Sequence, residues 1–255
     1  MAFTSARQTL EIGRVVSMTA SVIRRRLPSL IALSLVFYSL PVLALRIGFQ
    51  RLVTPHSGPG ITIGTGLLLA LVFVGGIIAG AVLQGAVTPL VRSQIDGGNM
   101  SFRAAMAAAF RSVPPLASVG VIFGLSVILG LFILIIPGLV LAAWWCVAAP
   151  ALAAENGGVR QALGRSRALT KGNRWRIMVL IVLNYGLAIA VGLAIQRAQL
   201  ALVPLNLGAS SSYAFAVIAS AADSVIATTG AAVLYAELRR VHDGVGLASL
   251  GAVFD

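Results

Sequence analysis

Charged side chains are scarce in this sequence. Only 10% of its 255 residues are Asp, Glu, Lys or Arg, whereas 58% are hydrophobic, and the mean hydropathy is +0.97. A soluble domain carries roughly a quarter of its residues as these four charged types. The composition therefore excludes an ordinary soluble domain and indicates a chain that lies in lipid.

The residue types that commonly build catalytic or metal sites are also few. The chain has seven acidic residues, two histidines and one cysteine, Cys146. A single thiol forms no intramolecular disulfide, and His56 and His242 are predicted on opposite sides of the membrane. No cluster suited to metal binding or acid–base hydrolysis can be assembled from these residues. We therefore expect no enzyme active site, no metal and no cofactor.

Strand-like alternation of polar and apolar residues is missing from the long apolar runs. Hydrocarbon offers no water to the backbone, so spanning segments are helices or closed barrels, and these runs lack the barrel pattern. The predicted fold class is therefore all-α, an integral membrane helical bundle. A hydrocarbon core about 30 Å thick needs roughly 20 apolar residues per helix. About six spans are predicted: Leu30 to Phe49, Ile61 to Leu83, Leu116 to Ile136, Leu139 to Ala154, Ile177 to Gln196 and Tyr213 to Leu238.

The whole chain is predicted to form a single transmembrane domain. Its predicted parts are an N-terminal interfacial segment at 1–29, a six-helix bundle at 30–238 and a cytoplasmic tail at 239–255. Only Pro137 and Gly138 join the third and fourth spans. This short joint predicts either a tight hairpin or a re-entrant pair.

Basic residues are distributed unevenly between the two sides of the predicted spans. Sixteen Lys and Arg residues fall on the side that holds both termini, and three fall on the other side. In multi-pass proteins the cytoplasmic loops carry the excess of Lys and Arg. We therefore expect both termini in the cytoplasm. The net charge of +12 is then explained by topology and by anionic lipid rather than by a nucleic-acid partner.

Three stretches on the predicted cytoplasmic side combine an apolar face with basic residues at helical spacing. They begin near Glu11, Ser101 and Val159, and each precedes a pair of predicted spans. Ser101 is a candidate N-cap for the second stretch, and Gly172 is placed to end the third. We expect interfacial helices at these positions. The chain is thus predicted to contain three units, each with one interfacial helix and one transmembrane hairpin.

The most specific stretch lies between Ile136 and Ile177. A Pro-Gly turn leads a helix that ends in Pro, an acidic residue follows, and a short helix then has the pattern A-L-x-R-S-x-x-L-T-x-G-N-x-W-R. The residues that carry this pattern are Pro137, Gly138, Pro150, Glu155, Ala162, Leu163, Arg165, Ser166, Leu169, Thr170, Gly172, Asn173, Trp175 and Arg176. The stretch resembles the membrane-domain family of glycerophosphodiester phosphodiesterases and related bacterial multi-pass inner-membrane proteins of unassigned function.

The resemblance implies a location in the bacterial inner (cytoplasmic) membrane. In some members of the family this membrane region is fused to a phosphodiesterase barrel that performs the hydrolysis. No segment of the present chain has the length, strand pattern or acidic residues for such a barrel. The resemblance therefore implies a membrane region without the catalytic half. One open alternative is that the chain is the membrane subunit of a separate phosphodiesterase.

Asp223 is an ionisable residue in the middle of the last predicted span. Ionisable residues at that depth are costly and by default indicate a functional site. Asp223 is therefore a candidate intramembrane polar site, together with Asn184, and a small transporter or channel that uses Asp223 is an alternative function. A structural explanation also stays open, in which Asp223 pairs with Arg197 or Arg46.

Six basic residues that follow the fourth predicted span are candidate contacts for anionic lipid head groups. They are Arg160, Arg165, Arg167, Lys171, Arg174 and Arg176. An alternative explanation is that their charge only fixes the topology. The leading hypothesis is a non-enzymatic multi-pass protein that engages phospholipid or a membrane partner in envelope or lipid homeostasis. Its expected partners are membrane lipids, including anionic phospholipid, and a second copy of the chain or another membrane protein.

Overall fold

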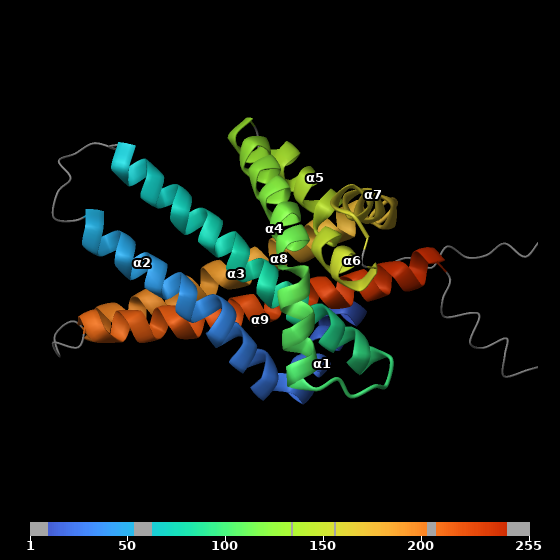
Figure 1. Ribbon diagram of the computed structural model, residues 1–255, viewed down its shortest axis with the longest axis horizontal. Helices are drawn as coiled ribbons and strands as arrows, with labels where there is room; N and C mark the ends of the chain where they lie inside the picture. Colours follow the sequence, from blue (N-terminus) through green and yellow to red (C-terminus); the bar gives the residue numbers. More distant parts are fainter. Residues whose placement is uncertain (1–9, 54–62, 134, 156, 203–207, 244–255) are drawn as a thin grey trace, which may run out of the picture.

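Helices make up almost all of the described part of the computed structural model. This part covers residues 10–53, 63–133, 135–155, 157–202 and 208–243. Three predicted features lie wholly or partly outside it: residues 1–9 of the N-terminal segment 1–29, residues 244–255 of the tail 239–255, and His56. In chain order the elements are α1 (Ile12–Ser34), the π-helical turn η1 (Leu35–Ser39), α2 (Leu40–Val53), α3 (Ile63–Ile95), α4 (Phe102–Ile133), α5 (Ile135–Trp145), α6 (Ala148–Glu155), α7 (Val159–Leu169), α8 (Arg174–Leu202) and α9 (Gly208–Asp243) (Figure 1). The all-α prediction is confirmed.

Six helical stretches of the described residues are long and apolar enough to cross a membrane. They are Ile12–Leu45, Gly66–Ile95, Phe102–Val127, Ile136–Glu155, Arg174–Ala201 and Tyr213–Asp243. Many large apolar side chains on these stretches stay exposed, as is expected where lipid covers them. The chain is a multi-pass helical membrane protein, as its composition predicts.

Three hairpins organise the six stretches. α2 packs on α3, α4 packs on α5, and α8 packs on α9. In Figure 1, α2, α3, α8 and α9 extend toward the same side of the molecule, whereas the hairpin of α4 and α5 points away at a steep angle. α4 ends at Ile133 and α5 begins at Ile135, so Pro137 and Gly138, the predicted joint, lie inside α5 and not in the turn.

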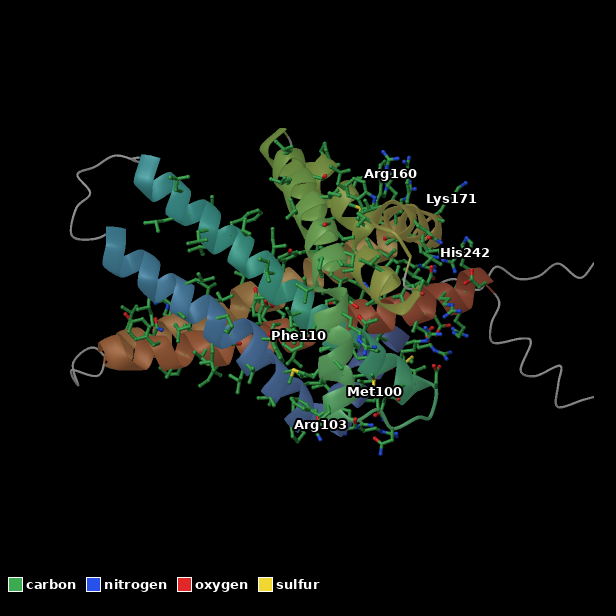
Figure 2. The ribbon with its side chains drawn as sticks, in the orientation of Figure 1. Met100, Arg103, Phe110, Arg160, Lys171 and His242 are labelled. Atoms are coloured by element: carbon green, nitrogen blue, oxygen red, sulfur yellow. The ribbon has the colours of Figure 1, made fainter. Side chains whose placement is uncertain are left out.

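One end of the bundle gathers the basic connections between helices. An ion pair joins Arg14 at the start of α1 to Glu237 near the end of α9, and hydrogen bonds join α3 to α6 and α7 to the end of α9. Figure 2 shows Arg160, Lys171 and His242 projecting from this same end. We call it the basic end. The structure thereby groups connections whose placement on one side was predicted from charge.

The predicted interfacial helix at 101–113 is not a separate element. α4 continues through Pro114 and Pro115 without a break. A single buried stripe explains this, because Ala105, Ala109 and Leu116 follow one another at helical spacing on both sides of the prolines. The free energy gained by packing this stripe outweighs the cost of the two hydrogen bonds that the prolines cannot donate. Membrane helices tolerate proline when neighbouring groups bond to the freed carbonyls. The interfacial segment and the third span are one helix.

The N-terminal interfacial segment is likewise continuous with the first span. α1 bends at Arg26, whose backbone angles are −118° and 18°, two residues before Pro28. Proline removes one helical hydrogen bond and clashes with the preceding turn, so a bend there has a local cause. Arg26 itself is non-helical, so α1 consists of two helical segments that meet at this kink. The kink lies four residues before Leu30, the predicted start of the first span.

The fourth predicted span, Leu139 to Ala154, is divided into α5 and α6. The break falls at Cys146 and Val147, and Pro150 explains it, because a proline has no N–H to donate to the carbonyl four residues earlier. The helix resumes where Ala151 N donates to Val147 O at 2.9 Å. The returning arm of this hairpin therefore consists of two short helices.

The apolar core lies in the half of the bundle nearer the basic end. Leu30 and Leu33 of α1, Leu83 and Val87 of α3, and Val233 of α9 are buried and belong to one cluster. α8, by contrast, has only 6% of its most apolar window buried. The bundle is therefore closed by protein near the basic end and exposed to lipid around α8.

Gly130 and Gly138 set the spacing of the α4 and α5 hairpin, which gives a test of the packing. A methyl group on Gly130 would lie 2.8 Å from the Gly138 Cα atom and 3.0 Å from its nitrogen. We expect Gly130→Ala to lower the free energy of unfolding by about 1–3 kcal/mol, because both close atoms belong to the backbone. Thermal unfolding in mild detergent measures this.

The matched control is Gly192→Ala in α8, where an added methyl group meets no atom within 4 Å. Alanine has a higher helix propensity than glycine, so this variant should keep or slightly raise the free energy of unfolding. Equal stabilities of the two variants would contradict the close packing of the hairpin.

Candidate functional site

α7 is an amphipathic helix that closes the basic end. Its buried residues are Ala162, Ser166 and Leu169, which share one face at helical spacing. The Ser166 hydroxyl donates a hydrogen bond of 2.8 Å to the Trp144 carbonyl at the end of α5. Gly172, with a φ of 89°, lets the chain reverse into α8 after the helix ends, as its position predicted. One face of α7 is thus fixed to the bundle, and the opposite face is free.

Arg165 joins two segments that are far apart in the sequence. Its Nε atom lies 3.1 Å from Glu155 Oε1, and its Nη2 atom bonds to Asp243 at the end of α9. Tyr235 of α9 donates a 2.7 Å hydrogen bond to the same Glu155 oxygen. The bond to Asp243 is the main cause that raises the pKa of the Arg165 guanidinium above its usual value. This predicted lipid contact is therefore engaged within the protein.

Arg176 and Asn173 hold the start of the described chain. Arg176 Nη1 donates to the Leu10 carbonyl at 3.0 Å, and the Leu10 N–H donates to Asn173 Oδ1 at 3.2 Å. Leu10 itself is buried. The first turn of α8 thereby anchors the segment that leads into α1. Arg176, another predicted lipid contact, also has a partner inside the fold.

Arg167 and Arg174 enclose an aromatic ring. Their guanidinium carbons lie 4.6 Å and 4.9 Å from the centroid of the Trp144 ring, which is within the range of cation–π attraction. Sequence reasoning missed this pairing, because Trp144 precedes the two arginines by more than twenty residues. Arg167 is nevertheless exposed, whereas Arg174 is half-buried.

Arg160 projects from the outer surface of α7, and Lys171 projects from the turn that follows this helix (Figure 2). Both are exposed, and the ion pairs of the described residues use other cations. The six basic residues predicted as one group therefore divide into three pairs. Two hold chain segments together, two contact Trp144 and two extend outward.

Glu237 is a site residue that the sequence analysis did not identify. Its carboxylate lies 3.2 Å from Arg14 Nε and 3.0 Å from Arg240 Nη2, and its side chain is only 6% exposed. The available signal was an acid at the end of the apolar run of α9, two residues before the pair of Arg239 and Arg240. This acid compensates basic charge where α1 and α9 meet.

Asp223 lies away from the basic end and lines a cavity. The cavity has a volume of about 680 Å³, is bordered by α8, α9 and Leu43 of α2, and also has Asn184 in its lining. We call it the Asp223 cavity. The structure thus brings together the two predicted residues of the intramembrane polar site. Within the described residues Asp223 forms no ion pair with Arg197, and the side chain of Arg46 lies outside the description.

The described residues contain no group of three or more His, Cys, Asp or Glu side chains that could hold a metal ion. In comparisons with known proteins, no family model, no curated protein and no solved structure matches the chain. The resemblance to the glycerophosphodiester phosphodiesterase membrane domain therefore stays a prediction.

Arg165 provides a test of the connection at the basic end. We expect Arg165→Gln to lower the free energy of unfolding by about 1–3 kcal/mol, because two partly buried carboxylates lose a charged hydrogen-bond donor. Unfolding in mild detergent at low salt measures the effect.

Arg160→Gln is the matched control, since Arg160 lies on the same helix and is exposed. This control should leave the stability within about 0.5 kcal/mol of the wild type. A loss of the same size in both variants would show that the basic charge of α7, and not the bonds of Arg165, determines the stability.

Proposed function

We propose that the chain is a non-enzymatic, multi-pass protein of a bacterial inner membrane that binds anionic phospholipid through the cytoplasmic surface of α7. One observation carries this proposal. Arg160 and Arg167 lie on the side of α7 opposite its buried residues, and Lys171 lies in the turn that follows α7. All three are exposed, and no acidic partner is within ion-pair distance of them in the described part of the chain. The charge of Arg160 and Lys171 is therefore available to a ligand outside the protein, and Arg167 adds an exposed cation that also contacts Trp144.

Helical geometry supports a common direction for the two arginines of α7. At about 100° per residue, positions 160 and 167 fall within roughly 20° of one another, and the buried stripe falls on the other side. Such a helix, with one fixed apolar face and one basic face, is suited to lie at the membrane surface. Trp175, 74% exposed at the start of α8, belongs to a residue type that is enriched at this interface.

The magnitude of the attraction is sufficient for measurable lipid selectivity. Each Lys or Arg near an anionic surface contributes about 1 kcal/mol, so three such residues favour anionic over neutral lipid by roughly two orders of magnitude. The attraction should weaken as salt rises, because exposed charges are screened.

The test compares two triple variants that remove the same charge. We expect Arg160→Gln, Arg167→Gln and Lys171→Gln together to lower the affinity for phosphatidylglycerol about tenfold or more, since the charged surface of α7 is removed. Native mass spectrometry of the full chain from mild detergent, read for retained phosphatidylglycerol against phosphatidylcholine, measures the change.

The control triple variant is Arg24→Gln, Arg25→Gln and Arg103→Gln, which changes three exposed residues on the same predicted side of the membrane. It should keep most of the binding. Equal losses in the two triple variants would show that general surface charge, and not α7, attracts the lipid. A wild-type protein without preference for phosphatidylglycerol would overturn the proposal.

A further inference from the structure

We propose that the Asp223 cavity binds a monovalent organic cation, an ammonium group carried on an apolar body. The proposal does not depend on lipid binding at α7, because the cavity lies between α8 and α9, away from the basic end. Four observations carry it: the size of the cavity, the composition of its wall, the groups near Asp223 and the elongated shape of the cavity.

The size and the wall of the cavity fit a small organic molecule. Its volume of about 680 Å³ lies within the range of roughly 300–1,000 Å³ that is usual for such sites. Leu43, Leu187, Val191, Ile195 and Ile226 line most of it, and they form an apolar surface for the body of a ligand. No Lys or Arg is among the described lining residues. The wall therefore favours a cation and disfavours a phosphate-bearing head group.

Oxygen-bearing groups surround the place where an ammonium group would lie. Asp223 supplies the negative charge, and Asn184 and Ser220 are further lining residues. Ser220 lies three residues before Asp223, so both side chains fall on the same face of α9. The Ser220 hydroxyl donates to Val217 O at 3.0 Å, which leaves its oxygen as an acceptor. The three residues together form an acceptor-rich site in an otherwise apolar wall.

Two tyrosines strengthen the case for an organic cation. Tyr213 lines the cavity, and the phenol of Tyr38 interacts electrostatically with Asp223. Tyrosine faces attract ammonium groups through cation–π interaction, and aromatic residues are the usual recognition element for alkylated ammonium ions. Tyr38 is carried by η1, and π-helical turns are frequent at functional sites.

The cavity is elongated along α8 and α9. Its lining runs from Asn184 to Gln199 on α8, and these two residues are about 22 Å apart along the helix at 1.5 Å per residue. On α9 the lining runs from Tyr213 to Ile226, so the exposed side chain of Asp223 lies near one end of it. Such a length accommodates an ammonium group at Asp223 and an apolar body extending along the two helices.

A hard metal ion fits this site less well than an organic cation. Ca²⁺ takes six to eight oxygen ligands, usually with several carboxylates, and Mg²⁺ keeps near-ideal octahedral geometry. Asp223 is the one carboxylate among the described lining residues. Most of the wall cannot coordinate a metal, whereas it can contact hydrocarbon.

The test is a binding titration of the purified full chain in mild detergent, with benzyltrimethylammonium as the probe. Neopentylbenzene, which replaces the charged nitrogen by carbon, is the neutral competitor. We expect the cation to bind, the neutral analogue to compete at least tenfold more weakly, and Asp223→Asn to lose about tenfold or more in affinity for the cation. Asp223→Glu, which retains the charge, should stay within a few-fold of the wild type.

Asp96→Asn is the matched control, because it removes an exposed carboxylate at the basic end and should leave binding unchanged. Three results would overturn the proposal. One is equal affinity in Asp223→Asn and the wild type, and another is equal competition by the neutral analogue. The third combines two findings: the cation does not bind, and the wild-type chain forms a dimer that Asp223→Asn dissociates. That result would show that a second copy of the chain covers Asp223.

Chemical protection locates the bound cation. Cys146 is the single cysteine, so Cys146→Ala gives a background in which Ala219→Cys places one thiol in the wall of the Asp223 cavity. We expect benzyltrimethylammonium to slow alkylation of this thiol several-fold. The same addition should not slow alkylation at Ala168→Cys, an exposed position on α7. Equal rates at residue 219 with and without the cation would place the cation elsewhere and overturn the assignment.

Discussion

The ionic and hydrogen-bonded contacts at the basic end hold together segments that are distant in the sequence. Arg165 joins the end of α6 to the end of α9, and Glu237 joins α9 to α1. Five acidic residues lie among the many basic ones at this end: Glu11, Asp96, Glu155, Glu237 and Asp243. Because the positive charges repel one another, these acids limit the repulsion while the basic excess remains available to orient the chain in the membrane. The position of α7, and with it the exposed basic surface, depends on these contacts.

The short pattern from Arg165 to Arg176 has a structural explanation at nearly every position. Arg165, Ser166, Asn173 and Arg176 bond to other segments of the bundle, with Asn173 and Arg176 both bonding to Leu10. Gly172 supplies the left-handed turn between α7 and α8. These contacts would be needed in any protein with this arrangement, whatever it binds. The pattern is therefore strong evidence for how the chain folds at this end and weak evidence for its activity. Functional information has to come from residues that the fold does not use.

The sequence predicted the elements that depend on composition and period, and it failed where a single contact decides. The six apolar stretches and the helix over α7 follow from length and spacing. The place of the turn between α4 and α5 does not, because α5 already includes Pro137 and Gly138. A proline also does not by itself decide whether a helix breaks, because α4 continues through Pro114 and Pro115, whereas α1 has a kink just before Pro28. That Asp223 and Asn184 belong to one intramembrane site was predicted from their positions within the predicted spans. The cation–π contacts of Trp144 and the role of Glu237 depend on tertiary proximity, which no local pattern encodes.

Asp223 differs from its neighbours on α9 in the way that its polar group is satisfied. Ser224 and Glu237, which are buried against α1, have partners within the protein. Asp223 lies on the exposed side of α9, next to the cavity, where the described residues offer no cation. A carboxylate at that depth is costly unless a cation, a proton or a hydrogen-bond donor meets it. The packing of α1 on one side of α9 therefore leaves Asp223 on the side that faces the cavity, with its charge left to be matched from outside the described chain.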